Sequence, residues 1–163
     1  MDVTTNNTKS KVNIRLLVGT GMLSGLAFVL QYLEFPIPIM PGFIKFDFSD
    51  LPALIGAFAY GPLAGVIVEF IKNLLHCTVT QSFTVGELSN FILGAVFTGT
   101  AGLIYKKNKT KKGAIIGAIV GSVIMGIISF PSNLFIVYPA YEKFTPINEI
   151  MDAYSKLLPS VGK

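Results

Sequence analysis

The chain has 163 residues, of which 52% are hydrophobic and only 13% are charged, and its mean hydropathy is +0.63. Because soluble domains carry about 25% charged residues, this composition excludes a soluble protein and indicates an integral membrane protein. The net charge of +4 does not indicate nucleic acid as a partner, since most basic residues lie in two short clusters beside apolar runs, as the positive-inside rule predicts for a protein in a lipid bilayer.

The first predicted membrane helix is the apolar run Leu16–Leu33, which is long enough to span a bilayer. Basic residues between positions 9 and 15 precede it and predict a cytoplasmic N-terminus. Gly21 and Gly25 form a small-xxx-small pair, which is typical of close helix packing. The spacing leaves open whether this strip packs inside the chain or against a partner.

The stretch Phe35–Asp50 breaks the helical pattern with three prolines and a glycine. Lys45, Asp47 and Asp50 lie among aromatic residues, and the stretch is too apolar for a solvated connection. We therefore expect an external lid that folds back over the membrane-embedded body.

Two further apolar runs, Leu51–Tyr60 and Leu63–Leu75, are separated by a Gly-Pro dipeptide that ends a helix. Glu69 and Lys72 lie on one face of the second run, at i and i+3. Ionisable groups at membrane depth are costly and normally face the bundle interior. A mutually neutralising structural pair is the preferred interpretation, and direct contact with a ligand is the alternative.

The fourth predicted helix is Gly86–Tyr105, which begins with the polar residues Glu87, Ser89 and Asn90. Five lysines in the seven residues that follow it are cytoplasmic if the N-terminus is, because four crossings separate the two basic clusters.

The fifth helix, Gly113–Val137, begins with three glycines at four-residue spacing, which predicts a second close-packing strip. Pro131, Ser132 and Asn133 interrupt the helix near its outer end. An asparagine inside a membrane helix needs a polar partner, so Asn133 is a candidate polar anchor in a cavity.

A membrane-embedded enzyme is a competing hypothesis, but the sequence contains no phosphate-binding loop, hydrolase motif or paired cysteines. The single Cys77 and single His76 exclude an internal disulfide and a histidine metal cluster. The pair Glu69/Lys72 and His76 are the only starting points for catalysis. A third hypothesis is a structural or pore-forming oligomer that packs through the glycine strips. This hypothesis does not explain the proline-rich lid.

Three runs carry a resemblance: F-D-F-S-D-L-P-A at 46–53, Y-G-P-L-A-G at 60–65 and I-K-N at 71–73. Together they resemble the riboflavin-specific substrate-binding (S) component of energy-coupling factor (ECF) vitamin transporters. The N-F pair at 90–91 and Asn133 followed by Y-P-A-Y at 138–141 extend the match. The resemblance covers most of residues 20–145.

The resemblance implies an all-α, multi-pass protein of the bacterial plasma membrane that captures riboflavin, FMN or a related flavin. It implies no enzymatic activity and no cofactor. A transmembrane coupling protein and two ATPase subunits would drive uptake, since this chain has no nucleotide-binding motif. An S component for another vitamin is the alternative within the family.

The resemblance also implies a substrate site beneath the lid. Its candidate residues are Lys45, Asp47, Ser89, Asn90, Asn133 and Tyr138. Gly21 and Gly25 are the candidate residues for docking on the coupling protein.

The chain departs from the family at its end. A sixth helix follows an L-L-P segment in relatives and completes the site, whereas only four residues follow Pro159 here. The expectation is therefore one transmembrane domain over residues 1–163, a bundle of five helices with the sixth truncated after about residue 159.

Overall fold

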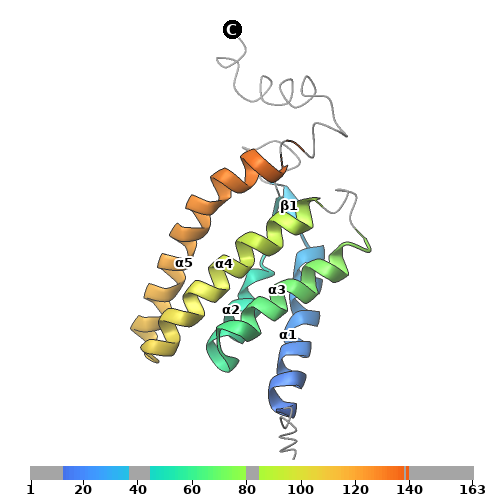
Figure 1. The fold of residues 1–163 in the computed structure, drawn as a ribbon. Helices are drawn as coiled ribbons and strands as arrows, with labels where there is room; N and C mark the ends of the chain where they lie inside the picture. The colour runs from blue at the N-terminus through green and yellow to red at the C-terminus, as the bar shows by residue number, and fades with distance from the viewer. Residues whose placement is uncertain (1–12, 37–44, 80–84, 138, 140–163) are drawn as a thin grey trace, which may run out of the picture.

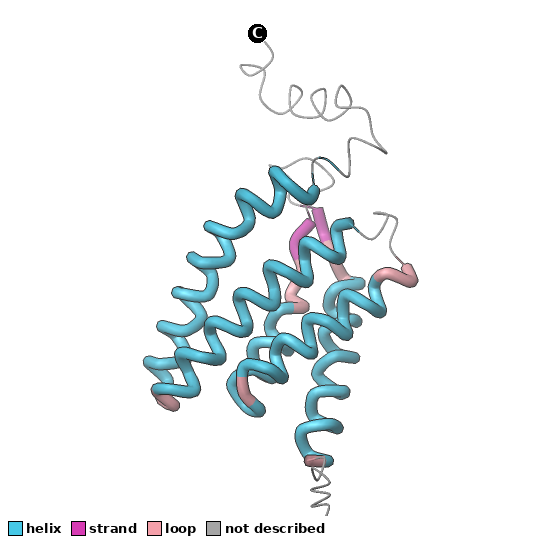
Figure 2. Tube along the Cα trace, in the orientation of Figure 1, coloured by secondary structure: helices cyan, strands magenta, loops and turns pink. Residues whose placement is uncertain are grey.

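The computed structural model describes residues 13–36, 45–79, 85–137 and 139. Five α-helices form a bundle, and two short strands lie between the first two helices (Figures 1 and 2). The elements in chain order are α1 (Ile14–Tyr32), β1 (Phe35–Pro36), β2 (Lys45–Phe46), α2 (Asp50–Tyr60), α3 (Pro62–His76), α4 (Val85–Lys107), α5 (Lys111–Ser132) and the π-helical turn η1 (Asn133–Val137). The five predicted helices are confirmed close to their expected bounds.

Helix α3 lies at the centre of the bundle and packs against α1, α2 and α4. Helix α5 packs on the other side of α4, and α2 also contacts α1 and α4. The start of α1 and the turns between α2 and α3 and between α4 and α5 lie at one end of the bundle (Figure 1). The strands, the start of α4 and the end of α5 lie at the opposite end.

The turn between α2 and α3 is made by one residue, Gly61, which is the last cap of α2 and the first cap of α3. Its φ of 104° is in a region that side chains with a Cβ rarely adopt. Pro62 then starts α3, where its missing N–H costs nothing. The Gly-Pro dipeptide therefore breaks the helix as predicted and reverses the chain within one residue.

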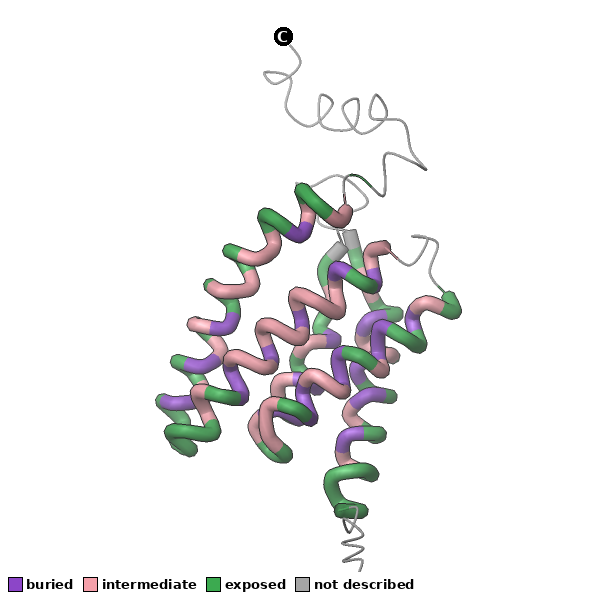
Figure 3. Tube along the Cα trace, in the orientation of Figure 1, coloured by how far each residue is buried: buried purple, intermediate pink, exposed green. Residues whose placement is uncertain are grey.

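The buried residues face the neighbouring helices (Figure 3), and they are mostly small or polar, while many large apolar side chains are exposed. Among the described residues, the buried hydrophobic ones are five alanines and one valine: Ala27, Ala53, Ala57, Ala64, Val68 and Ala101. Membrane helices pack in this way because lipid is as apolar as leucine, so close approach of the backbones stabilises the contacts. Helices α1, α4 and the segment from 111 to 137 are long and apolar enough to span a membrane.

The glycine strip of α5 packs closely on α4, as predicted. A Cβ on Gly117 would lie 2.8 Å from the carbonyl oxygen of Ala101, and one on Gly121 would lie 2.8 Å from that of Phe97. In contrast, a Cβ on Gly21 or Gly25 of α1 would meet no atom of the described residues within 4 Å. Two strips with the same spacing therefore have different surroundings.

The strands β1 and β2 pair antiparallel, with Phe35 opposite Phe46. The rings of Phe35, Phe46 and Phe48 cluster beside this pairing, with centroids 5.2–6.3 Å apart. In the described part of the chain, this short strand pair is the only regular secondary structure that is not helical in the expected all-α bundle. The tip of the predicted lid, residues 37–44, lies outside the described residues.

Candidate functional site

Polar side chains of α4 and α5 meet at the end of the bundle where the strands lie. Ser89 and Ser132 are buried, and their hydroxyl oxygens are 3.3 Å apart. Asn90 follows Ser89, Asn133 follows Ser132, and both asparagines are half-buried. The turn η1 also packs against α4, so the predicted site residues Ser89, Asn90 and Asn133 lie on neighbouring elements at this end of the bundle.

Asn133 lies where the helical hydrogen bonding of α5 changes. Pro131 has no N–H to donate, and the π-helical turn η1 begins two residues later, at Asn133. The side-chain amide of Asn133 donates to the Ser129 hydroxyl at 3.3 Å, and none of the described residues donates to its carbonyl oxygen. Single π-helical turns often occur at functional sites, because they turn a side chain away from its regular helical position.

Asp47 and Lys45 lie in the segment that leads from the strands into α2. The Asp47 Oδ1 accepts a hydrogen bond of 2.6 Å from the Ser49 backbone N–H, so this carboxylate fixes the turn before α2. The backbone of Lys45 pairs with Pro36 in the strand pair. The remaining predicted site residue, Tyr138, lies outside the described residues.

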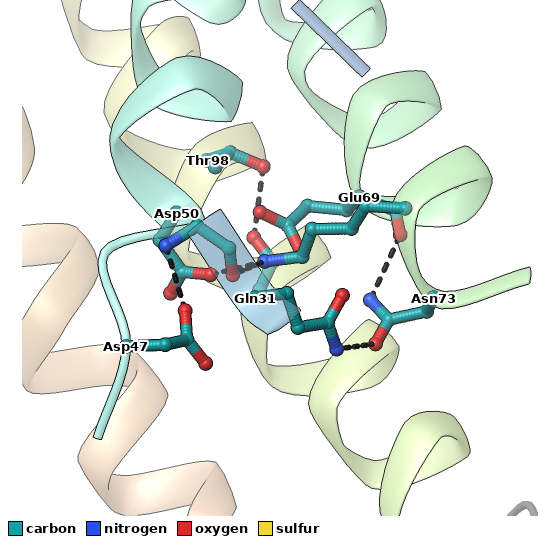
Figure 4. Close-up of polar contacts among 9 residues, drawn as sticks. Gln31, Asp47, Asp50, Glu69, Asn73 and Thr98 are labelled. Carbon is teal, nitrogen blue, oxygen red and sulfur yellow. Dashed lines mark hydrogen bonds and ion pairs between the residues drawn. The ribbon is translucent and has the colours of Figure 1, made fainter. Parts of the chain in front are cut away.

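A buried lysine, Lys72, joins this segment to α3, and two of its partners, Asp50 and Glu69, are labelled in Figure 4. The Lys72 Nζ lies 2.7 Å from Ser49 Oγ, 2.5 Å from Asp50 Oδ1 and 2.9 Å from Glu69 Oε2. Lys72 and Glu69 have no exposed side-chain surface, and 32% of Asp50 is exposed. The predicted pairing of Glu69 with Lys72 is therefore confirmed, whereas the two contacts of Lys72 to residues 49 and 50 were not predicted.

Two further polar contacts use the same face of α3. The Gln31 side-chain amide of α1 donates to Asn73 Oδ1 at 3.2 Å (Figure 4). The His76 Nδ1 lies 3.0 Å from Glu87 Oε1 of α4. The polar face of α3 could be predicted from the sequence, because residues 69, 72, 73 and 76 have the spacing of residues on one side of a helix.

Aromatic residues and a few polar groups lie at the same end of the bundle, and small-molecule sites usually combine these two kinds of side chain. Aromatic rings lie at the strand pair, and hydroxyl and amide groups lie at the ends of α4 and α5. Among the described residues, no group of three or more His, Cys, Asp or Glu side chains could hold a metal ion.

Comparison with known proteins identifies the family. The family "ECF transporter, substrate-specific component" matches residues 15–161, which is most of the chain. The chain belongs to this family. The resemblance found in the sequence motifs is thus confirmed, and the protein is a membrane-embedded S component.

Individual members of the ECF family align over most of their lengths. The riboflavin transporter RibU of Staphylococcus aureus is 40% identical over 157 residues, which covers 94% of this chain and 83% of the relative. The riboflavin transporter FmnP of Bacillus subtilis is 38% identical over 154 residues, covering 93% and 81%. A solved S component of a bacterial ECF transporter superposes with a TM-score of 0.74 at 34% identity, covering 92% of this chain and 99% of the solved chain.

Proposed function

We propose that this S component captures riboflavin for ATP-driven uptake through a bacterial plasma membrane. The observation that carries the proposal is the 40% identity to a riboflavin transporter over nearly the whole chain. The geometry of the site supports it, since a planar ring with polar edges suits apolar walls and a few amides and hydroxyls. The nucleotide hydrolysis would take place on partner ATPases, joined to this chain through a transmembrane coupling protein.

Within the site, Asn90 and Asn133 are proposed to bind the polar edge of the flavin ring, because an amide both donates and accepts hydrogen bonds. Ser89, which directly precedes Asn90 on α4, is proposed to contact the same ligand. Lys45, Asp47 and Tyr138 are proposed to complete the site.

The test is whether the purified protein binds a flavin. We expect protein produced in riboflavin-containing medium to co-purify with a yellow ligand that has flavin absorbance, and a ligand-free preparation to quench riboflavin fluorescence on titration. FMN titrated in parallel shows whether a phosphate on the ribityl chain is tolerated. Saturable binding of another vitamin with no response to either flavin would refute the proposal.

The glycines of α1 are proposed to dock on the coupling protein, because Gly21 and Gly25 are exposed and no described atom would obstruct a Cβ on either. Gly25→Leu should therefore reduce co-purification with the coupling protein while leaving riboflavin binding and folding intact. Gly126→Leu is the matched control, since Gly126 on α5 is equally open. Loss of folded protein in Gly25→Leu alone would show that the strip packs inside this chain.

The orientation is proposed from the two basic clusters, which place the start of α1 and the turn between α4 and α5 in the cytoplasm. Asn108 lies in that turn and is exposed. In a Cys77→Ser background, Asn108→Cys should not react with a membrane-impermeant thiol reagent in intact cells but should react after lysis. Labelling in intact cells would reverse the orientation.

A further inference from the structure

The segment from Lys45 to Asp50 carries two proposed ligand contacts and leads directly into α2. Its local geometry is fixed from two sides. Asp47 accepts a hydrogen bond from the Ser49 backbone, and the Ser49 hydroxyl accepts one from Lys72 of α3. Ser49 is fully buried, and its side chain does not cap α2. Its hydroxyl group instead contacts Lys72.

The Lys72 ammonium group donates two hydrogen bonds, to Ser49 and Asp50, and forms an ion pair with Glu69. An ammonium group has three donors, and three oxygens surround this one at 2.5–2.9 Å. Two of the three oxygens belong to residues 49 and 50, more than 20 residues earlier in the chain. Because a buried charge that loses its partners is strongly destabilising, Lys72 constrains the start of α2 to one position relative to α3.

The two carboxylates that contact Lys72 have different surroundings. Glu69 is on the same helix as Lys72, and its carboxyl group lies against α4, where a Cβ on Gly94 would be 2.2 Å from Oε2. Neither Glu69 oxygen accepts an aligned hydrogen bond from the described residues, so its link to Lys72 is an ion-pair contact alone. Asp50, by contrast, both accepts a hydrogen bond from Lys72 and belongs to the segment.

We propose that Lys72 is a positioning residue for ligand binding, which acts by holding the segment from Lys45 to Asp50 against α3. This inference rests on the proposed function, because residues 45 and 47 are placed at the flavin site there. Asp50 and Ser49 belong to the segment and transmit the constraint, whereas Glu69 belongs to α3 itself and contacts Lys72 beside Asp50.

The decisive comparison is between two isosteric variants, each of which removes one negative charge beside Lys72. Asp50→Asn weakens the link to the segment, whereas Glu69→Gln leaves that link in place. From the usual strength of a hydrogen bond to a charged group, we expect Asp50→Asn to raise the riboflavin off-rate about tenfold. Glu69→Gln should change it less than about twofold. If the two variants changed the riboflavin off-rate equally, Lys72 would have no specific role in positioning the segment, and the proposal would be overturned.

A second measurement does not depend on the ligand. In a Cys77→Ser background, spin labels at Phe46→Cys and Leu88→Cys report the distance between the segment and α4, and both sites are exposed. Asp50→Asn and Lys72→Met should broaden the distance distribution, and Glu69→Gln should not. Should Lys72→Met fail to fold, Asp50→Asn still decides the outcome. An unchanged distribution in Asp50→Asn would overturn the positioning role, whereas a wild-type protein that binds no flavin would refute the proposed function alone.

Discussion

Replacing Gly65 with alanine is expected to destabilise the bundle by about 1–3 kcal/mol, the usual cost of forcing extra volume into a packed interior. A Cβ at position 65 would lie 2.6 Å from the Cβ of Ala57 and 2.9 Å from the carbonyl oxygen of Ala53. Both atoms are fixed to the backbone of α2, so they cannot move aside as the end of a long side chain can. Thermal unfolding of the purified protein in detergent measures the effect.

Gly56→Ala is the matched control on the facing helix. A Cβ there would lie 3.4 Å from a methyl group of Leu23 and 3.5 Å from one of Val68, which are ordinary contact distances. Since alanine favours a helix over glycine by about 1 kcal/mol, this variant should be as stable as the wild type or more so. Identical unfolding temperatures for the two variants would contradict the close approach of α2 and α3.

Asn133→Leu is expected to weaken riboflavin binding about ten- to a hundredfold, since a lost hydrogen bond to a buried group costs roughly 1–3 kcal/mol and 1.4 kcal/mol corresponds to a factor of ten. The variant keeps a side chain of similar size and removes both the donor and the acceptor. Fluorescence titration with riboflavin gives the affinity, and the yield of folded protein should not change.

Ser129→Ala separates ligand contact from helix geometry. The Ser129 hydroxyl accepts from the Asn133 amide at 3.3 Å, so this variant removes the internal partner of Asn133 and keeps its amide. We expect its affinity for riboflavin to stay close to that of the wild type. If Asn133→Leu binds as tightly as Ser129→Ala, the site does not include the end of α5.

The helices of this protein could be predicted from the sequence because long apolar runs, a Gly-Pro turn and basic clusters mark their ends. The pairing of Glu69 with Lys72 was also predictable, since it depends only on the spacing within one helix. The contact of Lys72 with Asp50 was not, because it joins residues on two helices whose relative register is set by packing. Here the stripe of polar residues on α3 showed which face was buried, but not which partners it met.

The two glycine strips show a second limit of sequence reasoning. Gly117 and Gly21 both belong to repeats of small residues four positions apart, yet a Cβ on Gly117 would meet the backbone of α4, and one on Gly21 would meet no described atom within 4 Å. The spacing indicates that a second helix can approach the glycines closely. Whether a helix lies there depends on how the neighbouring helices are arranged. The proposed site could not be predicted from the sequence for the same reason. Its residues belong to separate elements, and the sequence does not show how far apart those elements lie in the fold.

The shortness of α2 has a consequence for the lipid around the protein. Its 11 residues rise about 16 Å, roughly half the thickness of a hydrocarbon layer of about 30 Å. The last residue of α2 lies at the end of the bundle shared with the turn between α4 and α5 (Figure 1), so for a bundle that crosses the bilayer along its length we expect Asp50, the first residue of α2, near the bilayer midplane. Residues 45–49 continue outward from there as a strand and a turn.

Backbone that is not helical is tolerated at such a depth only where protein surrounds it or water reaches it. The partial exposure of the Asp50 carboxylate fits a wetted position better than one in contact with acyl chains. We therefore expect one leaflet to be interrupted beside α2, with water replacing hydrocarbon down to the bilayer midplane. A polar solute arriving from that side would travel half the thickness of the membrane without leaving an aqueous environment.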